Sequence, residues 1–213
     1  MARITVIGGT GYAGGAIAAE AARRGHDVTA LSRTAPPNPI PGVTHVTGTA
    51  FDAKVREAAF ADADAVVLAT SPRGDMAGRQ LELARALASR AEETGARLIV
   101  VGGFSSLRPA QGAPRFVEGE IPPQYRDEAL AGHSVLEMLL AAPEALDWTF
   151  VSPAATFGAY APGEPTGTYR LGGEVAILNE VGGSRLSAPG LALAVVDLID
   201  AATHRREHVS VVE

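Results

Sequence analysis

Residues 8–14 constrain the fold more than any other part of this sequence. They read Gly-Gly-Thr-Gly-Tyr-Ala-Gly and directly follow a short apolar run, Arg3–Ile7. Gly8 would allow a tight turn out of a strand, Gly11 a close approach of the backbone to a bound group, and Gly14 close packing of a helix on the strand. The spacing therefore predicts a strand, a glycine turn and a helix in direct succession.

The beginning of a helix after such a turn is suited to binding phosphate groups. Its first backbone N–H groups lack partners within the helix, and the helix dipole places partial positive charge there. An ordinary glycine-rich turn has a similar composition, but this one follows a strand, opens a helix and begins a βαβ pattern. We therefore predict a dinucleotide-binding loop, to which the Thr10 hydroxyl adds a donor. The predicted binding residues are Gly8, Thr10, Gly11, Tyr12, Ala13 and Gly14.

Short apolar runs alternate with longer amphipathic stretches along the rest of the chain, which is typical of βα units around a parallel sheet. The predicted strands are 3–7, 27–31, 43–46, 65–69, 97–101, 147–151 and 209–212. The predicted helices are 12–24, 52–60 with Asp52 as its cap, 77–93, 127–142 and 191–202. The pattern predicts an α/β fold of three layers, with a doubly wound parallel sheet of the Rossmann type. We expect one domain over residues 1–213, with the substrate side formed from about residue 154 onward.

Two segments depart from the alternation. Pro36–Pro41 occupies the place of a helix between the second and third strands, and its prolines fix the backbone and remove amide donors. We expect a stiff surface loop there. Between Pro162 and Gly183, apolar runs around Tyr169 and at Ala176–Leu178 predict a small hairpin. With the last helix, this hairpin would form a cap over the substrate.

The end of the second predicted strand indicates which dinucleotide is bound. An acidic residue about 20 positions after the glycines would hydrogen-bond the ribose 2′-hydroxyl and favour NAD(H). This chain has Ser32, Arg33 and Thr34 there, with no carboxylate among them. A guanidinium can pair with a 2′-phosphate, and flanking hydroxyls can donate to it. Although Arg33 could also be a solvated surface residue, the pattern favours NADP(H) over NAD(H).

Composition argues against several other classes of protein. Lys and Arg total 18 against 24 Asp and Glu, a net charge of −6 with no basic stripe, so we expect no nucleic-acid partner. Because there is no cysteine and the histidines lack metal-ligand spacing, we expect no metal. The residues after Met1 do not resemble a secretion signal, and no apolar run has membrane length. We expect a cytoplasmic monomer or homodimer with no membrane partner and a small-molecule substrate.

Two further segments carry a resemblance to a known family. They are Asp147–Ala155, which reads DWTFVSPAA, and Gly167–Arg170, which reads GTYR. With the glycine loop, Arg33 and Gly102-Gly103, they resemble the NmrA-like, atypical short-chain dehydrogenases/reductases, in particular the NAD(P)H-flavin reductase group related to biliverdin reductase B. The resemblance extends nearly from end to end. It implies NAD(P)H as cofactor and a flavin as substrate.

The resemblance also implies cofactor contacts beyond the glycine loop. The residues implied are Ala69, Thr70 and Ser71 at the adenosine, and Pro153, Ala154 and Ala155 at the nicotinamide. Where the family has Gly-Asp after the third strand, this chain has Gly48 and Thr49, so Thr49 is expected near the adenine. Ser187–Gly190 replaces the acidic and aromatic residues that usually precede the last helix, which puts a substrate contact from that loop in doubt.

The sequence offers no standard acid–base pair. Short-chain dehydrogenases use a Tyr and a Lys four residues later, which lowers the pKa of the phenol. Tyr125 is followed at that distance by Ala129, and the single lysine is Lys54. Ser105 follows the fifth strand at the edge where ligands bind, although it could equally cap a turn. His133 stands where biliverdin reductase B has a histidine, and it could relay a proton or be a structural histidine.

We therefore predict an enzyme that transfers hydride from NADPH to a flavin or a similar flat acceptor. Such chemistry is carried by the cofactor, and the protein supplies orientation. Two alternatives stay open. A redox sensor could bind NADP(H) without turnover, although no DNA-binding segment supports it. An extended-type epimerase or isomerase would need the missing Tyr/Lys pair.

Overall fold

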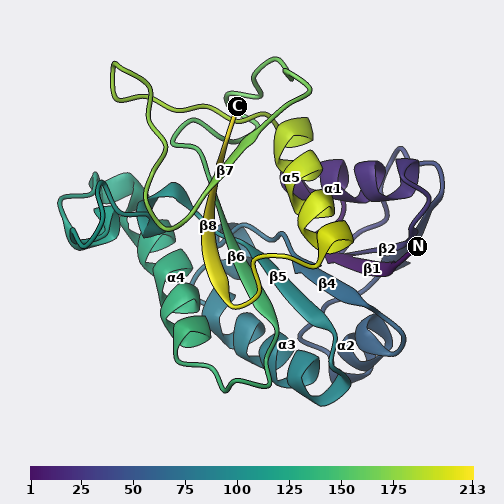
Figure 1. Ribbon diagram of the computed structural model, residues 1–213. Helices are drawn as coiled ribbons and strands as arrows, with labels where there is room; N and C mark the ends of the chain where they lie inside the picture. Colours follow the sequence, from purple (N-terminus) through teal and green to yellow (C-terminus); the bar gives the residue numbers. More distant parts are fainter.

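In a computed structural model that describes all 213 residues, the chain is organised around one eight-stranded sheet (Figure 1). The strands are β1 Arg3–Ile7, β2 Asp27–Ser32, β3 Val43–Thr47, β4 Ala65–Leu68, β5 Arg97–Val101, β6 Trp148–Pro153, β7 Arg170–Gly172 and β8 Glu207–Val212. They lie in the order β3-β2-β1-β4-β5-β6-β8-β7. All neighbours are parallel except β7 and β8.

Helices cover both faces of this sheet. They are α1 Tyr12–Arg23, α2 Ala53–Phe60, α3 Gln80–Thr94, α4 Pro123–Leu140 and α5 Ala188–Ala201. Figure 1 shows α1 and α5 side by side over one face and α2, α3 and α4 over the other, and two separate apolar cores fill the spaces between. This arrangement confirms the predicted three-layer, doubly wound fold. None of the helices is both long and apolar enough to span a bilayer.

The apolar strands are buried because both of their faces meet a core. In β4 all four residues are buried: Val66 and Leu68 belong to the core under α2 to α4, and Val67 belongs to the core under α1 and α5. Fully burying such a side chain contributes about 1.5–3 kcal/mol. A continuous apolar run, rather than an alternating one, is therefore what a central parallel strand requires.

Most predicted elements are confirmed, with shifted ends. Asp52 caps α2, where its carboxylate accepts hydrogen bonds from the backbone N–H groups of Lys54 and Val55. The segment 36–41 contains no helix, as expected. Helix α4 begins four residues earlier than predicted, with Pro123 in its first turn, a position that tolerates proline because its amide would be unpaired there anyway.

The predicted hairpin between Pro162 and Gly183 is wrong. Instead of pairing with residues 176–178, β7 pairs antiparallel with β8, with Arg170 opposite Val212. Val175 forms an isolated bridge with Arg108. The edge of β8 offers a row of backbone groups in need of partners, and a two-stranded hairpin alone is marginally stable. The segment therefore gains more by extending the main sheet.

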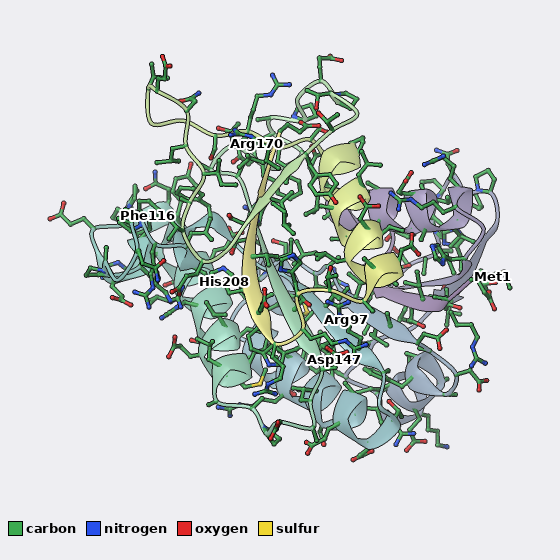
Figure 2. The ribbon with its side chains drawn as sticks, in the orientation of Figure 1. Met1, Arg97, Phe116, Asp147, Arg170 and His208 are labelled. Atoms are coloured by element: carbon green, nitrogen blue, oxygen red, sulfur yellow. The ribbon has the colours of Figure 1, made fainter.

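The carboxyl ends of β1, β4, β5 and β6 lie next to one another at one edge of the sheet. The strand order reverses direction between β1 and β4, and ligands of open α/β sheets bind at such a switch point. Figure 2 labels Arg97 and Asp147, which stand at the opposite, amino ends of β5 and β6. The fold thus places any ligand site among the loops that follow the four strands.

Candidate functional site

The glycine loop joins β1 to α1 in a turn that requires glycine at several positions, among them Gly8 and Gly14. Gly8 has φ +84°, in the left-handed region that favours glycine. At Gly14 an added Cβ would lie 2.3 Å from the carbonyl oxygen of Gly8, far inside van der Waals contact. The N–H groups of Gly8 and Gly9 both donate to the Leu31 carbonyl at 2.9 and 3.3 Å, which ties the loop to β2.

The first turn of α1 presents unpaired donors at the mouth of this loop. The backbone N–H groups of Tyr12, Ala13 and Gly14 have no acceptor within the chain. Thr10 and Gly11 are exposed beside them. Unpaired N–H groups at the positive end of a helix dipole fit the pyrophosphate of a dinucleotide.

The residues predicted at the 2′-phosphate lie at the carboxyl end of β2, outside the main cavity. Arg33 is exposed and forms an ion pair with Asp75, which the short 3₁₀ turn Gly74–Met76 brings across from the loop after β4. The Ser32 hydroxyl donates to the Thr34 carbonyl at 2.8 Å. Thr49, which was predicted near the adenine, is exposed after β3, and its hydroxyl accepts from the Phe51 backbone N–H at 3.3 Å. A phosphate at Arg33 would therefore have to replace Asp75.

A cavity of about 620 Å³ opens at the carboxyl edge of the sheet. It begins at the glycine loop and extends past the ends of β4, β5 and β6 toward α4. Its lining includes the predicted residues Gly11, Tyr12, Ala13, Ala69, Thr70, Ser71, Ser105, Pro153, Ala154 and Ala155. It does not include the predicted residues Gly8, Thr10, Gly14, Ser32, Arg33, Thr34, Thr49 and His133.

Two sets of contacts hold the side of this cavity that lies next to the glycine loop. Gln80, buried at the start of α3, donates from Nε2 to the Thr70 carbonyl and accepts from the Thr70 hydroxyl, both at 3.2 Å. The Tyr12 hydroxyl donates to the Pro162 carbonyl at 2.9 Å, and its ring packs against Phe157 at 5.3 Å between centroids. The first set fixes the end of β4, and the second anchors the segment after β6 over the glycine loop.

Ser105 lies in the 3₁₀ turn Phe104–Ser106 that follows β5. It is half-buried, lines the cavity, and its hydroxyl has no hydrogen-bond partner within the chain. Hydrogen bonds fix the backbone at both ends of its turn. The Ser152 hydroxyl donates to the Gly103 carbonyl at 2.9 Å, and Arg115 donates to the Ser106 carbonyl at 2.8 Å. Ser105 is therefore a positioned hydroxyl that is available to a ligand.

A buried polar network connects these two supports through His208. The side chain of Arg115 donates to His208 Nδ1 at 3.2 Å, so Nε2 carries the proton and donates to the Ser152 hydroxyl at 2.8 Å. Burial, together with the positive charge of Arg115, lowers the pKa of His208 to about 3. Glu174, after β7, accepts from Arg115 at 2.8 Å. Figure 2 shows His208 on β8 and, on the same flank, Phe116, the neighbour of Arg115.

His133 and Tyr125 both lie on α4 but differ in what they face. Tyr125 lines the cavity, and so does Ala129 at the place where a lysine would be needed. Lys54 lies far along the sheet, in the first turn of α2. The His133 ring does not line the cavity: its Nε2 is 3.7 Å from the Glu137 carboxylate one helical turn later. The structure thus brings Ser105, and not His133, to the candidate site.

Several side chains that line the cavity were not among the site residues predicted from the sequence. They are Arg73, Gln80, Phe104, Ile121, Glu128, Phe157 and Tyr160. Most of them belong to loops whose conformation depends on tertiary packing. The periodicity of apolar residues in the sequence therefore could not identify them. Glu128 sits one residue before Ala129 on the helix that was predicted, but nothing in the sequence indicated which face of that helix meets the cavity.

Comparison with known proteins agrees with this geometry. The sequence profile of a family described as NAD(P)H-binding matches residues 8–202. The Bacillus subtilis protein YwnB, itself uncharacterised, is 33% identical over 214 residues, which cover 99% of this chain and 98% of that protein. Both matches extend from the glycine loop to the last helix, the elements that build the site.

Similar solved structures carry different descriptions. A proposed exported protein from Burkholderia pseudomallei is 39% identical with a TM-score of 0.87, and a proposed NADH-flavin reductase from Streptococcus pneumoniae is 30% identical with a TM-score of 0.90. Each pair is covered completely in both chains. A proposed epimerase from Bacteroides thetaiotaomicron is 29% identical with a TM-score of 0.86, and the match covers 99% of this chain and 96% of that one.

Proposed function

Because the chain belongs to the NAD(P)H-binding family, we propose that it is an NADPH-dependent oxidoreductase that reduces a flavin or a similar flat acceptor. One observation carries this proposal: a continuous cavity joins the first turn of α1 to an aromatic wall on α4 and the segment after β6. One end suits a dinucleotide, and the other suits a planar ring placed against it. When bound, NADPH would supply the hydride.

The chain's own residues would orient the reactants. Pro153, Ala154 and Ala155, after β6, would border the nicotinamide, and the Ser105 hydroxyl could donate a hydrogen bond to a heteroatom of the acceptor. The acceptor takes up a hydride and one proton, leaving NADP⁺ and the reduced ring. Tyr125 at the mouth is 57% exposed, so water can reach the site and provide that proton. No buried acid is required.

Arg33 would select NADPH over NADH. Its present partner, Asp75, is held in an exposed ion pair, and such pairs contribute about 0–1 kcal/mol. A charge-assisted hydrogen bond to a phosphate is worth roughly 1.5–3 kcal/mol. The 2′-phosphate should therefore displace Asp75, whereas the 2′-hydroxyl of NADH would gain little from the guanidinium.

The similarity to a proposed epimerase supports a second candidate function less well. Epimerases of the extended short-chain type need a phenol activated by a lysine, and the only tyrosine on α4 has Ala129 in that place. A sensor that binds NADP(H) without turnover has no specific observation in its favour. Of these candidate functions, the reductase therefore requires the fewest residues that this chain lacks.

Steady-state NADPH oxidation would test the proposal. The purified protein is mixed with NADPH or NADH and, in separate reactions, riboflavin, FMN, FAD or a simple quinone. We expect NADPH to be consumed with at least one acceptor, and faster than NADH. Binding of NADPH without consumption with any acceptor would favour the sensor, and equal use of NADH would remove the role given to Arg33.

A further inference from the structure

The cavity has only two charged side chains in its lining, and they neutralise each other. Arg73 lies in the loop after β4, and Glu128 faces it from α4. Arg73 donates from Nε to Glu128 Oε2 at 2.6 Å and from Nη2 to Oε1 at 3.0 Å. A two-point pair of this kind uses the edge of the guanidinium that would otherwise recognise a phosphate or carboxylate. The cavity therefore offers no unpaired cation to an anionic substrate. The ion pair of Arg33 with Asp75 is easier to displace, because Asp75 makes one contact and its side chain is 87% exposed, whereas the Glu128 side chain is held at two points and is 34% exposed.

The rest of the substrate side consists of aromatic and aliphatic surface. Tyr125 is 57% exposed and Tyr160 is 70% exposed, although side chains of this size are usually covered. Both line the cavity together with Phe104, Ile121 and Phe157. Accessible aromatic faces at a cavity mouth favour stacking with a flat ring. The net charge of −6 adds a weak repulsion for anions.

We propose that the acceptor is an uncharged planar molecule, a quinone or an unphosphorylated flavin, and that the Arg73–Glu128 pair disfavours phosphorylated flavins. This inference rests on the proposed function and specifies its substrate class. A bound phosphate would have to take Arg73 from Glu128 and leave that carboxylate beside a second negative group. Like charges held together in this way oppose binding.

Riboflavin and FMN test the proposal because they share one ring system and differ by a phosphate. Their dissociation constants are measured from flavin fluorescence quenching with NADP⁺ present, and their kcat/KM values from NADPH oxidation. We expect the parent protein to prefer riboflavin in both measurements. Glu128→Gln removes the carboxylate and frees Arg73, so the ratio of FMN to riboflavin affinity should rise about two- to fivefold, the range for a partly exposed charge pair.

Asp127→Asn is the matched control, because it removes an identical charge from the neighbouring, exposed position of α4, outside the cavity lining. In Asp127→Asn, the ratio of FMN to riboflavin affinity should equal that of the parent. A parent that prefers FMN, or an unchanged ratio in Glu128→Gln, overturns the inference even if NADPH oxidation supports the reductase. The expected binding ratios without any NADPH oxidation would uphold the selectivity of the pocket and refute the proposed function instead.

Discussion

Acidification should destabilise the folded protein through His208. Its imidazole is neutral in the folded state, because burial and the charge of Arg115 lower its pKa to about 3. In the unfolded chain the pKa returns to its ordinary value near 6.5. Between these two values the unfolded state binds the additional proton, so the free energy of unfolding falls as the pH falls below about 6.5.

The size of this effect depends almost entirely on the unfolded chain. Going from about pH 7.5 to about pH 5.5 raises the protonated fraction of this histidine in the unfolded state from about one tenth to about nine tenths. This protonation stabilises the unfolded state by about 1.4 kcal/mol. The folded state stays unprotonated over that range. For a chain of this length such a change lowers the melting temperature by roughly 3–6 °C.

Thermal or urea unfolding of the parent and of His208→Gln at both pH values isolates the contribution. A glutamine amide can donate to Ser152 and accept from Arg115 at a spacing close to that of the imidazole nitrogens, yet it does not titrate. The other histidines are common to both proteins, so their effects cancel in the difference. Between the two pH values, the free energy of unfolding should fall by about 1.4 kcal/mol less in the variant than in the parent. Equal losses in the two proteins would show that His208 is protonated in the fold, and the network as described would be refuted.

Five further substitutions test the site. Arg33→Ala should weaken NADPH binding roughly ten- to hundredfold and NADH binding little, measured by titration; an unchanged NADPH affinity would remove the 2′-phosphate contact. Gly11→Val should abolish dinucleotide binding with little change in melting temperature, because a Cβ there meets no atom closer than 3.2 Å, whereas Gly14→Val should also unfold the loop. Ser105→Ala should lower turnover about tenfold, less than a true general acid would. Tyr125→Phe should leave kcat nearly unchanged, and a thousandfold loss would restore a tyrosine-based mechanism.

The fold and the phosphate loop could be predicted because their signals are local. A continuous apolar run such as Arg3–Ile7 is what a strand buried on both faces requires, and Gly14 is required by its contact with Gly8, six positions earlier. Asp52 was recognisable as a cap for the same reason. Each of these features is decided by near neighbours in the sequence, so it can be found without knowing the tertiary structure.

Other parts of the site depend on residues that are distant in the sequence. Asp75 reaches Arg33 only because the loop after β4 folds back across the end of β2. Arg115 and His208 are 93 positions apart, and neither stands in a motif. The hairpin prediction failed for a related reason, since β7 pairs with the last strand of the chain and not with its neighbour. Such pairings follow from the packing of whole helices and strands. The periodicity of apolar residues in the sequence gives no information about that packing.

We propose that this chain uses NADPH to reduce an uncharged planar acceptor. The most direct measurement follows the consumption of NADPH with riboflavin as acceptor, with the protein omitted in the control. We expect catalytic consumption of NADPH that continues through many turnovers and is faster than the consumption of NADH. Tight binding of NADPH with no consumption beyond the control, for riboflavin and for every other flavin or quinone, would contradict this proposal.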